Sequence, residues 1–349
     1  MLHSVLITGA SGYLGGALLA QLSRTSLPPH EKLYALVRSK EQAEAVTKYG
    51  ALPLVLDFRD QDRVIESIVN AKISVIYFLI DAGKSELQIP MIKALGEVKK
   101  QTGQDVHFLH TSGAKLFSQH VGFPTDRVIV DSDPELYDLL RNSKPPHAVM
   151  GQALKTNNVI IDTAESYGVR SYIFIPCIVY GEGEGFGNRI SIQTTAVVKA
   201  AKSVRAVHDV NSEGAIWPVC HIHDNTTLYV ELLRQILLGQ ELGNGKNGYY
   251  LASSGAVAWI DIYTAMAKSL AKRNVVDSEE VKKVDDAALG KIGQALACPK
   301  EMVAVQIGGK CMLRSSRGSR IGWKPKYSPE HILEAADAEV ELILKHLES

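Results

Sequence analysis

Residues 5–16 read V-L-I-T-G-A-S-G-Y-L-G-G, and this stretch decides the fold. The apolar run 5–7 predicts a buried strand, and Gly9, Gly12 and Gly15 stand where the chain turns into an apolar helix. Such a turn gathers free backbone N–H groups and the positive end of a helix dipole at one point, which suits a pyrophosphate. The turn therefore predicts a dinucleotide site. Its expected lining residues are Thr8, Gly9, Ser11, Gly12, Tyr13, Leu14 and Gly15.

The composition is that of an ordinary soluble globular protein, with 46% hydrophobic and 22% charged residues among 349. Lys+Arg and Asp+Glu both number 38, so the chain has no excess of positive charge that would favour binding to nucleic acid or to an acidic membrane surface. No apolar run is long enough to span a bilayer, and the first strand begins too early for a signal peptide. Partners are therefore expected to be a small-molecule substrate and, as an open alternative, a second copy in a homodimer.

The four cysteines stand far apart and include no C-x-x-C pair. This spacing favours reduced thiols over a disulfide framework or a zinc site, so we expect a cytoplasmic protein without a metal. The cysteines are Cys177, Cys220, Cys298 and Cys311.

Strand-like and helix-like segments alternate through the first half of the chain, and most of the strands are continuous apolar runs. This rhythm predicts an α/β fold with a doubly wound parallel (Rossmann) sheet covered on both faces. The expected strands are 2–8, 32–37, 52–56, 73–79, 106–111 and 170–175, and the expected helices are 13–25, 40–49, 61–70, 84–101 and 152–167.

The rhythm changes after residue 176, which predicts a Rossmann domain over 1–176 and a smaller mixed α/β substrate lobe over 177–349. We expect the chain to cross between the two. Residues 113–148, with four prolines, form the longest irregular stretch and a candidate active-site flap. Later expected elements are helices at 189–202, 225–238, 259–272 and 329–347 and strands at 216–222 and 249–252.

Five motifs carry a resemblance to a known superfamily: T-G-A-S-G-Y-L-G at 8–15, T-S-G at 111–113, I-P-C-I-V-Y-G at 175–181, H-I-H-D at 221–224 and G-W-K-P at 322–325. In order and spacing the chain resembles the extended short-chain dehydrogenase/reductases, and its second half resembles their epimerase/dehydratase-like members. The resemblance implies a nicotinamide cofactor and a small substrate held between the lobes. It also implies contacts to the nicotinamide from the V-Y-G turn, through Pro176 and Val179.

One expected pair is missing. The superfamily places a Tyr-x-x-x-Lys pair on the helix before the sixth strand, and its register here falls on Val149 and Ala153. Neither side chain can move a proton. The nearby Lys155 has Gly151 four residues before it, and Tyr137 lies far earlier in the chain. The chain is therefore identified as an atypical member whose proton donor is lost or relocated.

Three residues remain as candidates for the chemistry. Ser112 ends the fifth expected strand, where its hydroxyl can donate to a substrate oxygen or only bond its own turn. Lys155 can hold the nicotinamide ribose or only face water, and Tyr137 is a candidate donor from the flap. Around the glycine-rich loop 181–187, the sequence leaves open which charged side chains point into the substrate pocket. These side chains are Glu182, Glu184 and Arg189.

The choice of cofactor depends on Arg38, which follows the second strand where NAD-binding chains keep an acidic residue. A guanidinium suits a 2′-phosphate, so we expect NADP(H) rather than NAD. Asp57 is expected to contact the adenine or to cap the helix that starts near Asp60. His221 and His223 share one face if they lie on a strand, but no third soft ligand stands nearby, so no metal is expected.

These observations predict an NADP(H)-dependent oxidoreductase acting on a small carbonyl or hydroxyl metabolite. Two alternatives stay open because the Tyr-x-x-x-Lys pair is absent. One is a non-redox isomerase or lyase on the same fold. The other is a dinucleotide-sensing protein without turnover.

Overall fold

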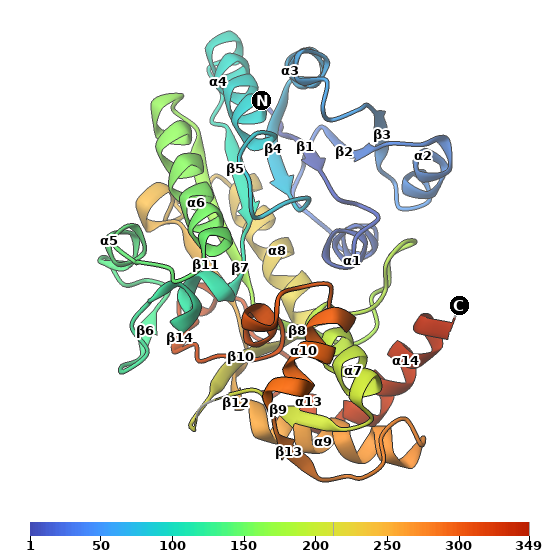
Figure 1. Ribbon diagram of the computed structural model, residues 1–349. Helices are drawn as coiled ribbons and strands as arrows, with labels where there is room; N and C mark the ends of the chain where they lie inside the picture. The colour runs from blue at the N-terminus through green and yellow to red at the C-terminus, as the bar shows by residue number, and fades with distance from the viewer. Residues whose placement is uncertain (212, 349) are drawn as a thin grey trace.

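The computed structural model describes residues 1–211 and 213–348 and is built around a seven-stranded sheet (Figure 1). The strand order is β11-β7-β5-β4-β1-β2-β3, and every neighbouring pair is parallel. The α/β prediction is confirmed. The strands are β1 (Ser4–Ile7), β2 (Lys32–Val37), β3 (Leu52–Val55), β4 (Ile73–Phe78), β5 (His107–Thr111), β7 (Arg170–Pro176) and β11 (Tyr249–Ala252).

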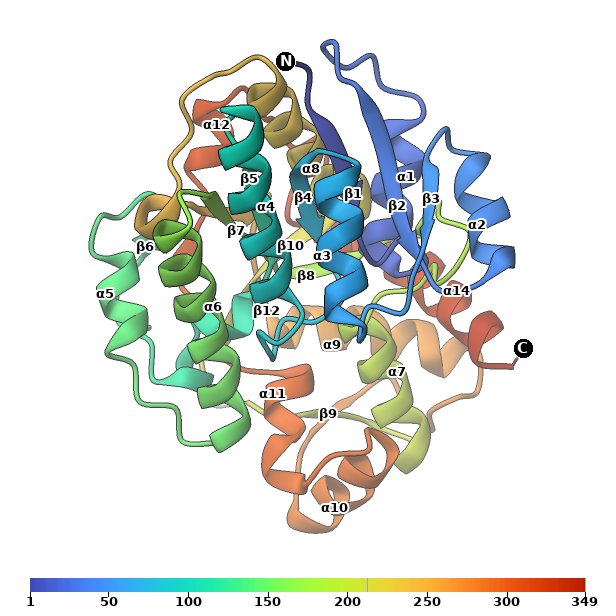
Figure 2. The same cartoon turned by 90° about the horizontal axis from the view of Figure 1, so that it is seen from above.

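Helices cover both faces of this sheet, which explains why its central strands β1 and β4 are buried along their whole length (Figure 2). Helices α3, α4 and α6 pack side by side on one face, and α1 packs against α8 on the other. Helix α2 lies against the edge strand β3. These helices are α1 (Tyr13–Leu22), α2 (Lys40–Thr47), α3 (Gln61–Asn70), α4 (Gln88–Thr102), α6 (Ala148–Ser166) and α8 (Ile222–Leu237).

The strand order reverses between β1 and β4, because the chain first runs outward through β2 and β3 and then returns to the other side of β1. Loops leaving the carboxyl ends of β1 and β4 therefore diverge and open a crevice. The functional site is expected at this point of any such sheet.

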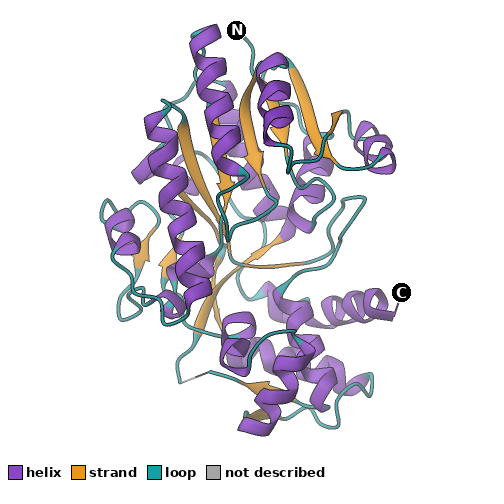
Figure 3. Cartoon of the chain, turned by 45° about the horizontal axis from the view of Figure 1, so that its top comes forward, coloured by secondary structure: helices purple, strands orange, loops and turns teal. Residues whose placement is uncertain are grey.

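The remaining elements form a second layer that lies beyond the carboxyl edge of the sheet and beside its edge strand β11 (Figure 3). It contains a three-stranded sheet, β12-β10-β8, and two pairs of short strands, β13-β9 and β14-β6. Its strands are β6 (Ile129–Val130), β8 (Ile178–Tyr180), β9 (Val207–Asp209), β10 (Ile216–His221), β12 (Gly255–Ala258), β13 (Val281–Lys283) and β14 (Leu313–Arg314). Its helices are α5 (Leu136–Arg141), α7 (Gln193–Val204), α9 (Trp259–Lys272), α10 (Asp286–Ala295), α11 (Val303–Ile307), α12 (Arg317–Arg320), α13 (His331–Glu334) and α14 (Ala336–Glu348), with 3₁₀ turns η1 (Ala114–Phe117), η2 (Gln119–Val121), η3 (Gly245–Asn247) and η4 (Lys300–Met302).

The chain crosses between the two layers. Strand β11 follows the second-layer strands β8 to β10 in sequence, yet it pairs with β7 at the edge of the large sheet. Helix α8 likewise returns to pack on α1. The regular alternation of strands and helices in the sequence therefore ends near residue 176, but residues beyond it complete the large sheet.

Residues 113–148 were expected to be the longest irregular stretch, but much of this stretch is folded. They contain η1, η2, β6 and α5, and Phe117, Leu136 and Leu140 among them are fully buried. The buried carboxylate of Asp131 accepts backbone N–H groups from Leu251, Ser316 and Arg317. Those partners lie more than a hundred residues away, so the local sequence, rich in proline, gave no sign of this anchoring.

The four cysteines are all free thiols, and three of them are buried. Over the residues that the structure describes, no helix combines the length and the apolar character needed to cross a membrane.

Candidate active site

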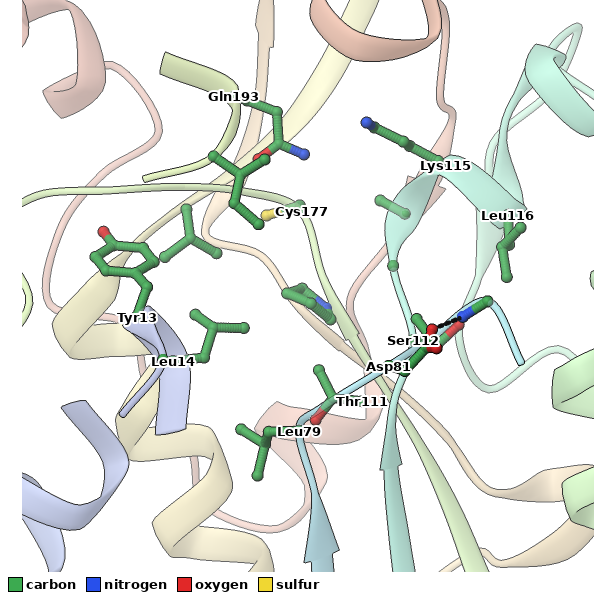
Figure 4. Close-up of a pocket in the computed structure, with 18 of the residues that line it drawn as sticks. Tyr13, Leu14, Leu79, Asp81, Thr111, Ser112, Lys115, Leu116, Cys177 and Gln193 are labelled. Carbon is green, nitrogen blue, oxygen red and sulfur yellow. Dashed lines mark hydrogen bonds between the residues drawn. The ribbon is translucent and has the colours of Figure 1, made fainter. Parts of the chain in front are cut away.

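A cavity of about 520 Å³ opens at the reversal point of the large sheet (Figure 4). The loops that follow β1, β4, β5 and β7 form its floor and sides, and α6 and the start of α7 complete it. Its lining residues are Gly12, Tyr13, Leu14, Gly15, Leu79, Ile80, Asp81, Ala82, Gly83, Thr111, Ser112, Gly113, Ala114, Lys115, Leu116, Met150, Ala153, Pro176, Cys177, Val179, Asn188, Ile192, Gln193 and Trp217.

The glycine loop forms one side of this cavity. Gly9 has φ +70°, and a Cβ on Gly15 would lie 2.2 Å from the Gly9 carbonyl oxygen, so only glycine permits this turn and this close helix. Helix α1 begins at Tyr13, its N-cap Gly12 offers no side-chain cap, and its first turn holds no acidic residue. The first N–H groups and the helix dipole are thus free for an anion. This donor set fits a pyrophosphate.

A second glycine-rich loop, residues 181–188, lies directly on the first. The Asn188 N–H donates to the Ser11 carbonyl oxygen at 2.9 Å, and a Cβ on Gly187 would come within 2.1 Å of that oxygen. The Tyr13 hydroxyl donates to the Gly181 carbonyl oxygen at 2.6 Å. Glycine in the second loop therefore allows its backbone to contact the backbone of the first glycine loop.

Thr8, Gly9 and Ser11 do not line the cavity, although all three were expected at the dinucleotide site. The buried Thr8 hydroxyl accepts the Leu79 N–H at 3.0 Å and so joins the ends of β1 and β4. Ser11 meets the second loop through its backbone, and its hydroxyl accepts from Gln42 at 3.5 Å. Both residues stabilise the loop around the site.

Arg38 is exposed just beyond β2, with its guanidinium carbon 5.8 Å from the centre of the Phe58 ring. The Arg38 N–H donates to the Gln42 side-chain oxygen at 2.9 Å, while the same amide reaches Ser11. Ser39 caps α2 by accepting the Gln42 N–H. Arg38 therefore lies close to the glycine loop but does not line the cavity.

Asp57 is exposed beyond β3 and is paired with Arg59 at 2.7 Å. The Arg59 guanidinium and backbone N–H lower the pKa of this carboxyl to about 2. The N-cap of α3 is Asp60, whose carboxylate accepts the Arg63 N–H, so the capping alternative for Asp57 is wrong.

Ser112 lies at the carboxyl end of β5, is 6% exposed and lines the cavity. Its hydroxyl oxygen accepts a hydrogen bond from the Asn157 amide at 3.0 Å. Asn157 belongs to α6 and is buried. It lies four residues after Ala153, on the same side of the helix, and this spacing is the signal in the sequence that could have revealed it.

Helix α6 presents Met150 and Ala153 to the cavity, at the register where the resemblance places its lysine. Val149 is 69% exposed and does not line it. Lys155 is exposed and is absent from the cavity wall, in contrast to the prediction. Two residues along a helix turn the side chain by about 200°, so a residue that follows Ala153 by two faces the other way.

Tyr137 does not reach the cavity either. Its hydroxyl donates to Asp162 at 2.9 Å and accepts from Arg141, on the outer side of α6. Helix α5, which carries Tyr137, packs against α6 and η3. The tyrosine thus connects two helices, and it is too firmly held there to deliver a proton to the site.

Three titratable side chains in the cavity wall are restricted by their hydrogen bonds. The Cys177 thiol donates to the Ala252 carbonyl oxygen at 3.0 Å, and burial raises its pKa. Burial also raises the pKa of Tyr13. The Asp81 carboxylate accepts the Gly83 N–H at 2.7 Å.

The fourth titratable group, Lys115, was missed at the level of sequence. It stands on η1 three residues after Ser112, and burial lowers the pKa of its ammonium to about 8.

Pro176 and Val179 line the cavity as the resemblance implies. Glu182, Glu184 and Arg189 do not: Arg189 pairs with Glu182 at 2.9 Å, and Glu184 pairs with Arg24.

His221 and His223 do not share a strand face, because β10 ends at His221 and α8 begins one residue later. Instead, the His221 ring accepts the His223 N–H at 3.1 Å and caps that helix. Across the described residues, no three or more His, Cys, Asp or Glu side chains gather as a metal site requires.

The parallel sheet, its reversal point and the open glycine loop together define a dinucleotide-binding α/β protein. A family model described as the NAD dependent epimerase/dehydratase family matches residues 5–241. The chain belongs to this family and is an enzyme of it, which confirms the resemblance seen in the five motifs. The family and the glycine loop support a nicotinamide dinucleotide as the cofactor.

Solved structures agree at the level of the fold. UDP-glucose 4-epimerase of Thermotoga maritima with UDP-glucose is 15% identical over 99% of each chain, with a TM-score of 0.61. UDP-glucose 4-epimerase of Thermus thermophilus in complex with NAD is 14% identical over 97% of this chain and 99% of that chain, with a TM-score of 0.60. A monomeric L-threonine 3-dehydrogenase from a metagenome is 16% identical over the same shares, with a TM-score of 0.58. No curated protein sequence matches the chain significantly.

Proposed function

We propose that this protein is an NADP(H)-dependent oxidoreductase that acts on a small carbonyl or hydroxyl compound. The observation that carries the proposal is the pairing of Ser112 with Asn157 inside the cavity. Because the Ser112 oxygen accepts from Asn157, its own O–H is directed elsewhere, and the cavity is where an acceptor can lie. A substrate carbonyl oxygen fits that position, since a fixed donor there stabilises the charge that develops on it.

The cofactor would be held by this chain's backbone more than by its side chains. The uncapped N–H groups of α1 suit the pyrophosphate, and Pro176 and Val179 line the wall where the resemblance places the nicotinamide. When bound, a nicotinamide supplies or accepts the hydride. The apolar side chains Leu79, Met150 and Trp217 surround that position and keep water away from it.

The preference for NADP(H) rests on Arg38. No ion pair involving its guanidinium occurs within the described part of the chain, and Gln42 holds its backbone next to Ser11. A free planar cation at the end of β2 suits a 2′-phosphate, with Ser39 next to it in the chain and the Ser11 hydroxyl connected to it through the Gln42 amide. The negative charge of Asp57, the nearest carboxylate after β3, is already paired with Arg59 and so does not oppose the binding of a phosphate.

Two measurements test this proposal. Calorimetry with NADPH and NADH should show tighter binding of NADPH, and equal dissociation constants would remove the NADP assignment. A screen of small aldehydes and ketones should show loss of the reduced-nicotinamide absorbance in step with product. Conversion without net loss of that absorbance would contradict net reduction.

The second candidate, a non-redox isomerase or an enzyme that returns the hydride, is favoured by one observation. Positions 149 and 153 carry a valine and an alanine, so the usual proton carrier is absent from α6. A nicotinamide labelled with deuterium at the transferred position separates these outcomes. Deuterium found in the product would show that the cofactor transfers its hydride to the substrate. Deuterium that stays entirely on the cofactor would show that the reaction is non-redox.

A further inference from the structure

Lys115 is a cation without an anionic partner. Its ammonium donates only to the Gln306 side-chain oxygen, at a long 3.4 Å. Within residues 1–211 and 213–348, no carboxylate forms an ion pair with it. A desolvated charge of this kind is costly unless something compensates it.

The groups around Lys115 do not supply that compensation. The Cys298 thiol is close enough to interact electrostatically, but burial raises the pKa of Cys298, so this thiol is neutral at pH 7. His120, the other titratable neighbour, is a second weak base whose ring bonds the Gly308 carbonyl oxygen. Gln306 from α11 is neutral. Lys115 therefore faces a cavity in which the missing negative charge has to come from outside the chain.

Donors converge on the same end of the cavity from the opposite wall. Figure 4 shows the side chains of Lys115 and Gln193 pointing toward each other across it. Gln193 is the first residue of the twelve-residue helix α7, and the N-cap of this helix, Ile192, makes no side-chain cap. Both residues line the cavity, so the positive end of the α7 dipole faces it as well.

We propose that Lys115, Gln193 and the first turn of α7 form a subsite for an anionic oxygen group of the substrate, a carboxylate or a phosphate. The substrate role rests on the proposed function, because the reacting oxygen is placed at Ser112. Such a group would lie between an ammonium, an amide and uncapped backbone N–H donors, the arrangement that binds oxyanions well.

This subsite is separate from the one that suits the cofactor's phosphates. In Figure 4, Tyr13 and Leu14 lie on one side of the cavity and Lys115 lies on the other. Thr111 and Ser112 lie below Lys115 in this view, at the end of β5. A substrate with an anionic group at Lys115 would thus extend toward Ser112 with its reacting carbonyl.

The charge on Lys115 sets the expected pH dependence. With a pKa of about 8, the amine is mostly protonated at pH 7 and mostly neutral at pH 9. An anion bound beside it favours the protonated form, so binding takes up a fraction of a proton. The affinity for an anion of constant charge is therefore expected to fall about tenfold from pH 7 to pH 9, because that affinity follows the protonated fraction.

The test uses the NADP⁺-loaded protein and two small anions, malonate and inorganic phosphate, measured by calorimetry. Malonate keeps its charge between pH 7 and pH 9, so it reports the pH effect, and phosphate distinguishes the two anion chemistries. Lys115→Met should weaken binding at pH 7 by about tenfold to a hundredfold, the value of one charge-assisted contact. Lys115→Arg should bind at pH 7 and lose little affinity at pH 9.

Lys155→Met is the matched control, since it removes a lysine from the solvent side of α6 and should change nothing. Binding that is equal in the wild-type protein and Lys115→Met, or no binding of either anion, would overturn the subsite. The proposed function fails differently, through the carbonyl screen and the cofactor measurements. Lys115-dependent anion binding in a protein that turns over no carbonyl would thus keep the subsite and remove the oxidoreductase.

Discussion

The two sides of the cavity were built in different ways. On the glycine-loop side, the site is made of backbone: uncapped N–H groups at α1 and a second loop that touches the first through Gly187. On the β5 and α6 side, it is made of side chains, and α6 carries Ala153 there in place of the superfamily's lysine. A binding site made of backbone N–H groups is therefore kept by every protein that shares the fold. A site made of side chains can change in each protein by substitution.

The same difference explains how the chemistry can have moved. Removing a tyrosine and a lysine from α6 leaves the parallel sheet and the glycine loop intact, since neither depends on those side chains. What remains on that side is Ser112 held by Asn157, with Lys115 further along η1. Three predictions test the two sides of the cavity separately, from the largest expected effect to the smallest, and a fourth concerns the stability of the fold in acid.

Gly12→Val should abolish dinucleotide binding. A Cβ at this position would already lie 3.2 Å from the Gly9 carbonyl oxygen, and the larger side chain would stand where the phosphates approach. We expect a loss of about a hundredfold or more, from the roughly 3 kcal/mol that overpacking can cost. Calorimetry with NADPH measures it. Gly290→Ala, where the added Cβ meets no neighbouring atom, is the control. Normal binding by folded Gly12→Val would place the cofactor elsewhere.

Ser112→Ala tests the side of the cavity that β5 and α6 form from side chains. Turnover should fall by about tenfold to a thousandfold, because one donor to a developing oxyanion is lost. Cofactor affinity should stay unchanged, since the glycine loop is untouched. Steady-state kinetics and calorimetry on the same preparations give both values. Ser166→Ala, which removes an exposed hydroxyl from the end of α6, should behave like the wild type. Unchanged turnover in Ser112→Ala would show that the reacting oxygen lies at another group.

Arg38→Asp tests whether a side chain next to the glycine loop determines the choice between NADPH and NADH. The wild type should prefer NADPH over NADH by about one to two orders of magnitude, the value of one charge-assisted contact of about 1.5–3 kcal/mol. The variant should narrow or reverse that preference. The ratio of the two dissociation constants is the readout, with Arg63→Gln on α3 as the control. A ratio that Arg38→Asp leaves unchanged would contradict the role of the guanidinium.

The fourth prediction concerns β5, the strand that ends at Thr111, next to Ser112. Burial lowers the pKa of His110 to about 3, and neither ring nitrogen has a hydrogen-bond partner among the described residues. The unfolded chain takes up a proton below pH 6.5 and the folded chain does not. The free energy of unfolding should therefore fall by up to about 1.4 kcal/mol per pH unit between pH 6.5 and pH 3.

Urea unfolding at several pH values measures this slope. His110→Phe cannot take up a proton in either state, so its unfolding free energy should depend less on pH than that of the wild type. His223→Gln, an exposed histidine outside the sheet, serves as the control. Parallel pH slopes in the wild type and His110→Phe would assign the acid sensitivity to other groups.

The sequence by itself determined the sheet and the cofactor side. Continuous apolar runs, the helices between them and the spacing of Gly9, Gly12 and Gly15 predicted both, because these features act over a few neighbouring residues. Six strands and the helices between them were placed close to their observed bounds for that reason. The missing pair on α6 was also visible as Val149 and Ala153, since a register is counted along the chain.

Only the tertiary structure decided which side chains reach the cavity. Lys155 and Ala153 differ by two positions on one helix, and the rotation of α6 against the sheet turned one to solvent and the other inward. Asp131 anchors residues 113–148 through partners more than a hundred residues away, and β11 joins the sheet from the far end of the chain. Lys115 is a half-buried cation because η1 places it in the cavity wall, where the Gln306 side chain of α11 accepts its hydrogen bond. Such contacts depend on distances in space, which no local pattern of residues records.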